Sequence, residues 1–513
     1  MDLYIDNVRA DVLRTSFAIN WRWYDIENPL KRYAVASTNM TLPFSAINNN
    51  IFSFTNIAGS DLTPVWDEVE AKIYFGNYLA LAGLLKLNNI DITKKQFNTS
   101  IKGDNNVIND LNANTPRDIM SADMTANIPV AWNTLSLAID SLNSGSYGWL
   151  LPVIDDGTNL FAQSGATLDY EIISVNDLRR NELWISLDNF ITRAFSSASI
   201  DLKIFESGSI VNYSASSIKT IWANEYMPAY HIGLKASTLT PRITRTDTES
   251  RYFNSGQGVI TNANIIVCGG LDTFDVFKEV CRKFNMGIYI DQIDSKIIMF
   301  DLNTTNTPTI DWSDKLISHK KTPLIKNYAK TNYIKFKPTD NLDDTFGQIT
   351  LLNNPAIKYI KDTKTLGTIN VAIPGVYDYY GTTGILLESN IFKLDYFSSK
   401  GAYNSLVLLN KSNLSAINFN VTVYSIYGNT AASKQLYKMS FLDSSSYFNW
   451  IEDKALDISE SYDTEIELNL SDLVDLRPWN LVKVKQIGEE FYINEIKNLN
   501  FNRPAKVKLI KLA

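Results

Sequence analysis

The chain has 513 residues, of which 45% are hydrophobic and 20% are charged, and its formal net charge is −7. This length allows several domains with cores of their own, and the composition is that of a folded globular protein. Proteins that hold nucleic acid are usually basic and cluster their Lys and Arg residues, whereas this acidic chain has no long basic run. Composition and charge thus argue against a protein that binds DNA stably. They do not exclude a channel through which DNA passes without being bound.

The cysteines and the apolar segments indicate where the chain is made. Cys268 and Cys281 are too few for a disulfide framework, and we expect both to be buried thiols. Residues 1–12 contain acidic side chains and lack the apolar run of a secretion signal. The longest apolar stretch, at residues 78–85, is shorter than the ~20 residues of a membrane helix. We therefore expect synthesis in a cytoplasm and no stable membrane binding.

Strand patterns dominate residues 1–115, which we predict to form an N-terminal β domain. Apolar or alternating runs predict strands at residues 2–8, 15–23, 69–75, 78–87 and 96–102. Gly76 and Asn77 separate two of these runs and are typical of a two-residue hairpin turn. A proline and an asparagine cluster predict an extended loop at residues 41–54.

Residues 116–245 mix the two periodicities, and we predict an α/β domain there. Apolar residues at helical spacing predict a helix at residues 182–195, and a strand pattern follows at 200–205. The same order, a helix and then strands, recurs later in the chain, which suggests an internal duplication.

The clearest local pattern lies in residues 246–325, which we predict to be a strand–helix–hairpin domain. After a strand at residues 265–268, Phe274, Phe277 and Val280 share one face of a helix. Asp272 or Thr273 is suited to cap this helix, and Gly287 is placed to end it. Strands at 288–290 and 296–300, joined by a polar turn, complete a hairpin.

Residues 326–513 return to strand patterns and are predicted to form a β-rich C-terminal domain. Strands are expected at residues 332–336, 419–424 and 481–487, and two more within 491–512, interrupted at 500–504. The predicted fold class is mainly β with α+β modules in a multidomain chain.

No motif in the chain predicts catalysis. His231 and His319 lack the neighbouring ligands of a metal site, and no serine lies in a nucleophile elbow. Gly269 and Gly270 lie between a strand and a helix, as phosphate loops do, but the remaining glycines of that fingerprint are absent and Asp272 would repel a phosphate. We predict no catalytic, cofactor-binding or metal-binding residue, no cofactor and no enzyme activity.

Two other groups of residues have more than one interpretation. Acidic residues at 155–157 and 291–294 are typical of ordinary turns, because calcium loops need more oxygen ligands. Aromatic residues that could stack on sugars are expected to serve packing instead; these are Trp21, Trp23, Tyr24, Tyr379 and Tyr380. A pair of carboxylates that cleaves a polysaccharide stays open as an alternative, because sequence spacing does not fix a distance in space.

Three segments together resemble a known family. They read TLPFSAINNNIFSF followed by VEAKIYFGNYLALAGLLKLNNIDI, then TFDVFKEVCRKFNMGIYIDQIDSKIIMF, and finally WNLVKVKQIGEEFYINEIKNLNFNRPAKVKLIKL. In this order they resemble the tail and baseplate hub structural proteins of tailed bacteriophages, especially Bacteroidota-infecting phages and prophages. The resemblance extends over most of the chain, through loose patterns and not through a fingerprint.

The resemblance implies an architecture and partners. Tube-like β domains would be combined with small helix–hairpin domains. Copies of the chain would form a homo-oligomeric ring, with a trimer favoured. The ring would join the tail tube to the tip or spike of the virion, after assembly in the host cytoplasm, and DNA would be only passing cargo. No fused lysozyme or peptidase module is evident. The alternatives are a neck, ring or adaptor protein of the virion and a carbohydrate-active or receptor-binding tail protein.

Overall fold

The structure is a computed structural model of the whole chain. It describes residues 2–13, 18–22, 35–57, 68–103, 105–127, 147–150, 152–153, 161–164, 167–172, 182–236, 241–245, 270–291, 294, 296–302, 310–323, 328–338, 348–352, 355–356, 358, 361–373, 375–380, 386–393, 406–413, 419–425, 428–434, 437–442, 445–448, 460–474, 476–499 and 503–512. The described part is mainly β, with several sheets and small α/β modules, so the predicted fold class is confirmed.

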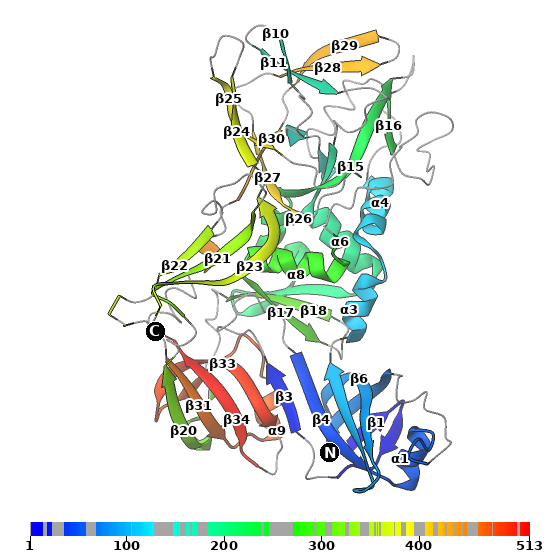
Figure 1. Ribbon diagram of the computed structural model, residues 1–513, viewed down its shortest axis with the longest axis vertical. Helices are drawn as coiled ribbons and strands as arrows, with labels where there is room; N and C mark the ends of the chain where they lie inside the picture. Colours follow the sequence, from blue (N-terminus) through cyan, green and yellow to red (C-terminus); the bar gives the residue numbers. More distant parts are fainter. Residues whose placement is uncertain are drawn as a thin grey trace.

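A 13-stranded sheet joins the two ends of the chain, at the bottom of Figure 1. Its N-terminal strands are β1 (Asp2–Ile5), β2 (Val8–Ala10), β3 (Ala18–Arg22), β4 (Val35–Pro43), β5 (Glu68–Phe75), β6 (Tyr78–Asp91) and β7 (Gln96–Gly103). Its C-terminal strands are β19 (Ile310–Asp311), β20 (Leu316–Pro323), β31 (Glu460–Ile466), β32 (Leu481–Val484), β33 (Gly488–Leu499) and β34 (Ala505–Lys511). The antiparallel pair β3–β33 connects the two groups.

Alternating burial explains why these segments form strands. In β7, Phe97, Thr99 and Ile101 are buried, and the residues between them are more exposed, as expected for a sheet with one covered face. The β5–β6 hairpin turns at Gly76, whose φ of +60° favours glycine, so the predicted turn is confirmed.

The prediction of an extended loop at residues 41–54 is wrong. Strand β4 continues through Pro43, and helix α1 (Ala46–Ile51) follows. Ser45 caps this helix, because its hydroxyl accepts the backbone N–H of Asn48 at 3.2 Å. Asn48 is fully buried, and its side-chain amide donates to the carbonyl oxygens of Asp11 and Pro43, each at 2.9 Å. The asparagine cluster therefore supplies a buried tether as well as turn residues.

A four-stranded sheet forms the centre of the molecule, in the order β14 (Ser209–Asn212), β13 (Asp201–Glu206), β18 (Lys296–Asp301) and β17 (Met286–Asp291). Around it lie α3 (Asn105–Asn112), α4 (Pro116–Asn127), α6 (Leu187–Ser197) and α8 (Thr273–Lys283) (Figure 1). Helix α7 (Ser217–Trp222) belongs to the same module. The predicted helix and hairpin of residues 271–302 are confirmed as α8, β17 and β18, and Asp272 is the N-cap residue.

Two boundaries in this central module differ from the predictions. The first five residues of the helix predicted at residues 182–195 form strand β12 (Glu182–Ser186), and α6 begins only at Leu187. Gly287 does not end α8; the helix stops at Lys283 and the chain turns through Asn285, whose φ is +52°. Gly287 instead lies in β17, where a Cβ atom would come within 2.2 Å of the Phe300 ring.

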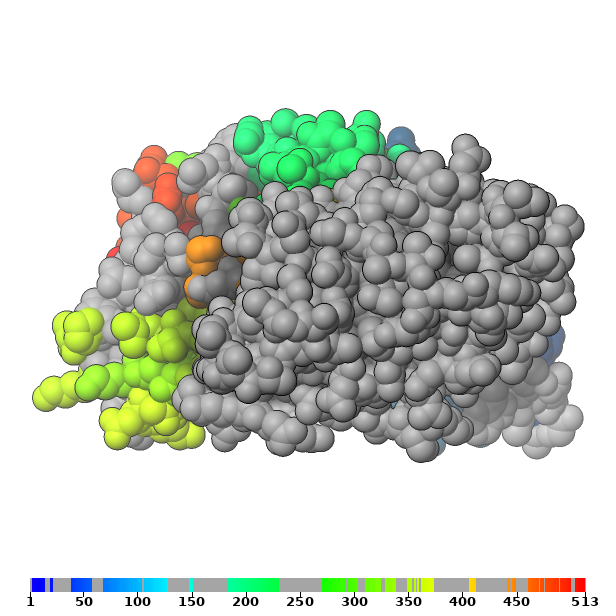
Figure 2. Space-filling view, turned by 90° about the horizontal axis from the view of Figure 1, so that it is seen from above, coloured from blue at the N-terminus to red at the C-terminus, as the bar shows by residue number. Residues whose placement is uncertain are grey.

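The remaining strands form four more sheets. A seven-stranded sheet contains β8 (Trp149–Leu150), β9 (Pro152–Val153), β12, β15 (Glu225–Ala236), β16 (Pro241–Arg245), β27 (Leu409–Asn413) and β30 (Tyr437–Ser440). One four-stranded sheet contains β10 (Phe161–Ser164), β11 (Thr167–Ile172), β28 (Phe419–Ser425) and β29 (Gly428–Lys434), and another contains β21 (Thr331–Pro338), β22 (Gln348–Leu352), β23 (Thr363–Ile373) and β26 (Leu406–Val407). The last is a hairpin of β24 (Gly375–Tyr380) and β25 (Leu386–Lys393). Seen from above, the yellow-green region of β21 to β23 projects at the left of the molecule (Figure 2).

The sheets combine segments that are far apart in the sequence. The parallel pair β13–β18 joins residues of the predicted domains 116–245 and 246–325, and the 13-stranded sheet joins residues of 1–115, 246–325 and 326–513. The division of the chain at 115, 245 and 325 into separate folding units stays a prediction.

Trp479 packs where the 13-stranded sheet meets the central module. Its ring stacks on Phe205 at a centroid distance of 4.7 Å and also contacts Tyr289 and Phe300, at 5.9 and 5.5 Å. The same apolar cluster includes Tyr492 of β33 and Ile510 of β34, so one end of the C-terminal sheet face is covered by this module.

A buried polar group fixes α6 to α7 and predicts a dependence of stability on pH. The hydroxyl of Tyr213 donates to Asp188 Oδ1 at 3.0 Å, and Lys219 Nζ lies 2.5 Å from Asp188 Oδ2. Burial, together with the negative charge of Asp188 and the hydrogen bond to it, raises the pKa of Tyr213 above its ordinary value of about 10.

Because the pKa of Tyr213 is higher in the folded chain than in the unfolded chain, its hydrogen bond to Asp188 contributes fully to stability below pH ~10. This contribution is lost as the pH rises further, since the phenol then ionises in the unfolded chain but not in the folded one. Above that pH, the free energy of unfolding of the wild type should fall by up to about 1.4 kcal/mol per pH unit more steeply than that of Tyr213→Phe. Urea unfolding of both proteins at several alkaline pH values measures the difference, and parallel curves would contradict it.

Candidate interaction surface

The main path of the 13-stranded sheet ends in two strands that can pair with another chain, and a side branch from β33 through β32 ends at β19. In the strand order of this sheet β2 is at one end and β20 at the other, and no further strand among the described residues pairs with their outer sides. Each edge also exposes an apolar side chain, since Val8 of β2 is 47% exposed and Ile317 of β20 is 54% exposed. An unpaired edge with apolar side chains is a template for pairing with another chain.

Next to the β20 edge, one face of the sheet has a row of alternating charges. Lys320 lies opposite Asp463, Asp463 opposite Lys508, and Lys508 opposite Glu495, across strands β20, β31, β34 and β33. A second row two residues away contains Ser318, Glu465, Lys506 and Lys497, in the same strand order. Opposite charges on facing strands attract each other, so the first row supports the strand register. In the second row only Glu465 and Lys506 have opposite charges, because Lys506 also faces Lys497.

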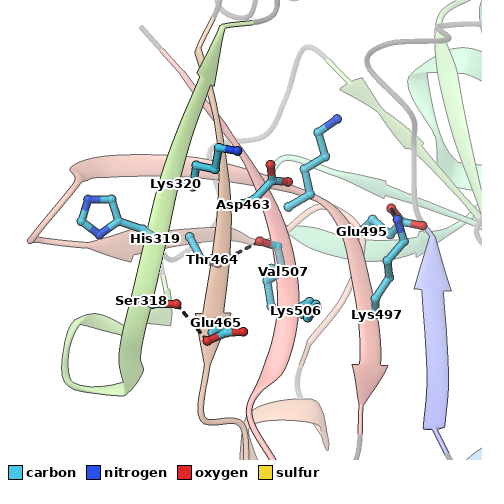
Figure 3. A pocket seen from close by; sticks show the side chains of 11 residues that line it. Ser318, His319, Lys320, Asp463, Thr464, Glu465, Glu495, Lys497, Lys506 and Val507 are labelled. Atoms are coloured by element: carbon cyan, nitrogen blue, oxygen red, sulfur yellow. Dashed lines mark hydrogen bonds and ion pairs between the residues drawn. The ribbon is translucent and has the colours of Figure 1, made fainter.

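The rows line an open groove of about 400 Å³ (Figure 3). Ser318 donates a hydrogen bond to Glu465 Oε2 at 2.9 Å, and Thr464 donates to the carbonyl oxygen of Val507 at 2.8 Å. His319 is directed away from the charged rows, as the alternation of side chains along β20 requires. The groove contains lysines and carboxylates in similar number, which suits a polar protein surface better than an anion such as DNA.

The end of β20 is stabilised by a charged pair. Lys321 Nζ lies 2.5 Å from Glu460 Oε1, and this hydrogen bond raises the pKa of Lys321. Partial burial acts to raise the pKa of Glu460, but hydrogen bonds from Lys321 and Tyr462 and the charges of Lys321 and Lys511 lower it overall. Both residues therefore stay charged at neutral pH and hold β20 against β31.

The structure does not bring the sequence candidates together into one site. His319 lies exposed on β20, and the backbone of His231 lies in β15, a different sheet. Cys281 is buried, as predicted, with its Sγ 3.9 Å from Met299 Sδ. Trp21 is half-buried and packs against the core of the large sheet. Outside the described residues lie Trp23, Tyr24, Cys268, Gly269 and residues 155–157; of Tyr379 and Tyr380 the structure describes only the backbone, in β24.

The other turn candidates behave as ordinary structural residues. Gly270 precedes α8 with a φ of +73°, a conformation that glycine adopts readily. Asp291 Oδ1 accepts the backbone N–H of Asp294 at 3.4 Å, and Lys296 pairs with both carboxylates, so the segment is a turn closed by a cation.

The described ranges lack two further kinds of feature, a metal-binding cluster and a membrane-spanning helix. No group of three or more His, Cys, Asp or Glu residues is arranged there to hold a metal ion. No helix in that part of the chain combines the length and the apolar character needed to span a membrane.

Comparison with known proteins gave structural similarity only. No model of a protein family and no curated protein matches the chain. Among solved structures, the 43 kDa tail protein of prophage MuSo2 from Shewanella oneidensis is similar with a TM-score of 0.38 and 7% identity, over 99% of this chain and 97% of that one. The tail protein from Neisseria meningitidis MC58 has a TM-score of 0.37 and 7% identity, over 99% and 95%.

A third similar structure is the prophage tail protein gp18 from Listeria monocytogenes EGD-e, with a TM-score of 0.33 and 8% identity, over 99% of this chain and 94% of that one. All three are thus described as tail proteins. Similarity with such low TM-scores and identities carries no argument about what this chain does.

Proposed function

We propose that this protein is a structural component of a bacteriophage tail, of the kind found in Bacteroidota-infecting phages and prophages, and that copies of it form the hub ring between the tail tube and the tip or spike. The observation that carries the proposal is the 13-stranded sheet, which is built from both ends of the chain and whose main path ends at β2 and at β20, with a side branch that ends at β19. The sequence resemblance to hub proteins supports the same function.

A sheet with two different edges can form a ring. If β20 of one copy pairs with β2 of the next, the contact is head-to-tail, and such contacts close into a ring when the rotation between copies allows it. Closure would remove both edges from solvent, which is the usual protection against uncontrolled strand pairing. The resemblance favours three copies in this ring.

The polar groove beside β20 supports a contact between proteins. Its alternating charges offer complementary partners to another polar surface, and such surfaces fix the orientation of a complex more than they add affinity. We propose the tail tube and the tip or spike as the proteins bound on the two faces of the ring, with DNA passing through and not bound. The role is structural, without catalysis on a substrate, in the virion tail after assembly in the host cytoplasm.

A substitution at the β20 edge tests this function. Ile317→Lys places a charge where the next strand would pack, and we expect it to shift the purified chain from a ring-sized oligomer to the monomer in native mass measurement. Ile92→Lys is the matched control, because Ile92 is 68% exposed but lies outside the edge strands, and it should leave the oligomer intact. A wild-type chain that stays monomeric at every concentration and is absent from tail particles would overturn the proposal.

A further inference from the structure

Three side chains with complementary chemistry, two of them fully buried and that of Asn410 partly buried, meet at the boundary of α8 with strands β15 and β27. The side chains of Lys283 and Glu225 are both 0% exposed, and Lys283 Nζ donates to Glu225 Oε2 at 2.5 Å. The other oxygen of the same carboxyl group, Oε1, accepts the side-chain amide Nδ2 of Asn410 at 3.2 Å. One carboxyl group thus holds an amine and a primary amide at the same time.

The fold positions these groups through backbone pairing. Glu225 and Asn410 lie directly opposite each other in the antiparallel pair β15–β27, and the N–H of Lys411 donates to the carbonyl of Asn224 at 3.0 Å. Side chains in such opposite positions have their Cβ atoms about 4.5–5.5 Å apart. Lys283 is the last residue of α8, so its side chain reaches the same point from the end of a helix.

The ion pair is removed from water, and two aromatic rings lie beside the amine. Lys283 Nζ lies 5.3 Å from the ring centroid of Phe284 and 5.0 Å from that of Phe441. Taking two charges out of water costs several kcal/mol per ion before their attraction offsets it. Transfer of one proton from Lys283 to Glu225 converts the ion pair to an amine and a carboxylic acid, without any change in net charge.

We propose that Lys283 and Asn410 form an intramolecular isopeptide bond, with Glu225 as the general acid–base. A neutral lysine amine is a nucleophile, and a neighbouring group that takes its proton activates it. The protonated carboxyl group of Glu225 then donates to Oδ1 of Asn410, after the amide plane turns over, and so makes Cγ more electrophilic.

The atoms balance without an oxidant or another reactant. Nζ attacks Cγ of Asn410, the Nζ–Cγ bond forms, the Cγ–Nδ2 bond breaks, and Nδ2 leaves as ammonia with a proton relayed by Glu225. One of the original protons remains on the new amide nitrogen, three leave on ammonia, and the last stays on the carboxyl group of Glu225. The reaction happens once per chain and modifies the protein itself.

The alternative is an ordinary buried ion pair, which fixes α8 to β15 and needs no chemistry. The two interpretations differ in covalent mass. The bond would join residue 283 to residue 410 and would make the chain lighter than its sequence by the mass of one ammonia molecule. It would also survive boiling, detergent and reducing agents, because it is an amide.

Intact-mass spectrometry of the purified full-length chain, followed by tryptic peptide sequencing, tests the proposal. We expect the loss of one ammonia and a branched peptide in which Lys283, uncleaved by trypsin, is joined to Asn410. A mass equal to that of the sequence would overturn the proposal. So would a loss of ammonia located on a linear peptide, since that would indicate a cyclised asparagine elsewhere.

Variants test the assigned roles. Lys283→Met removes the nucleophile and Glu225→Gln removes the acid–base at constant shape, and both should retain the full mass and give no branched peptide. Lys278→Met, in the same helix α8, is the matched control and should keep the bond. A branched peptide in Glu225→Gln at the wild-type yield would overturn the role of Glu225. The wild-type measurement does not depend on whether any variant folds.

Discussion

Phe277→Ala is expected to lower the free energy of unfolding by about 3–5 kcal/mol. Phe277 is 1% exposed, and its ring contacts Phe195 of α6 edge-to-face at 5.1 Å between centroids and Phe274 at 6.3 Å. Truncation removes a ring that joins α8 to α6 and leaves a cavity that two packed helices cannot close. Urea unfolding followed by circular dichroism measures the change.

The control for Phe277 is an apolar residue on the outside of the same module. Ile210 of β14 is 47% exposed, and Ile210→Ala should change the free energy of unfolding by no more than about 0.5 kcal/mol. We expect Phe277→Ala to impair ring assembly as well, through misfolding and not through a lost contact between copies. Unchanged melting of Phe277→Ala would contradict its role in the core.

Local signals were sufficient to predict α8 and its hairpin. Phe274, Phe277 and Val280 repeat at helical spacing, and all of them are buried. The same reasoning wrongly predicted a helix for the residues of β12. Leu183, Trp184 and Ile185 are all fully buried, so this strand has no polar face. Its apolar run continues directly into α6. A strand covered on both sides shows no alternation, and periodicity alone then cannot separate it from a helix.

Long-range pairing was beyond the reach of sequence patterns. The strand pattern of residues 505–511 with its alternating lysines was recognised as a strand, yet nothing in it indicates that Lys508 faces Asp463 on one side and Glu495 on the other. The groups proposed to form the isopeptide bond are still more remote, since Glu225 is 58 residues from Lys283 and 185 residues from Asn410. The pairing of β15 with β27 brings Glu225 and Asn410 together, and the end of α8 brings Lys283 to them.

Asp123→Ala is the second substitution for which we expect a large loss. The side chain of Asp123 in α4 is 3% exposed; its Oδ2 accepts Trp149 Nε1 at 2.8 Å and Asn189 Nδ2 at 3.1 Å, and its Oδ1 accepts Asn127 Nδ2 at 2.7 Å. Trp149 is fully buried, and leaving such a donor without its acceptor costs roughly 1–3 kcal/mol. Asn189 is half-buried and Asn127 is exposed, so they add less, and we expect a total loss of about 2–4 kcal/mol in urea unfolding. Asp110→Ala, at an exposed position of α3, is the matched control and should stay within about 0.5 kcal/mol.

A double-mutant cycle identifies which donor causes the loss at Asp123. Trp149→Phe removes the indole N–H and keeps an aromatic ring in the buried position. If the hydrogen bond from Trp149 accounts for much of the cost, the double variant should be less destabilised than the sum of the single variants, by about 0.5–3 kcal/mol. Additive losses would show that Asp123 acts through its other partners, which are Asn127, Asn189 and Arg193, whose Nε lies 3.7 Å from Asp123 Oδ1. A loss no greater than that of Asp110→Ala would show that this network does not stabilise the contact of α4 with α6 and β8.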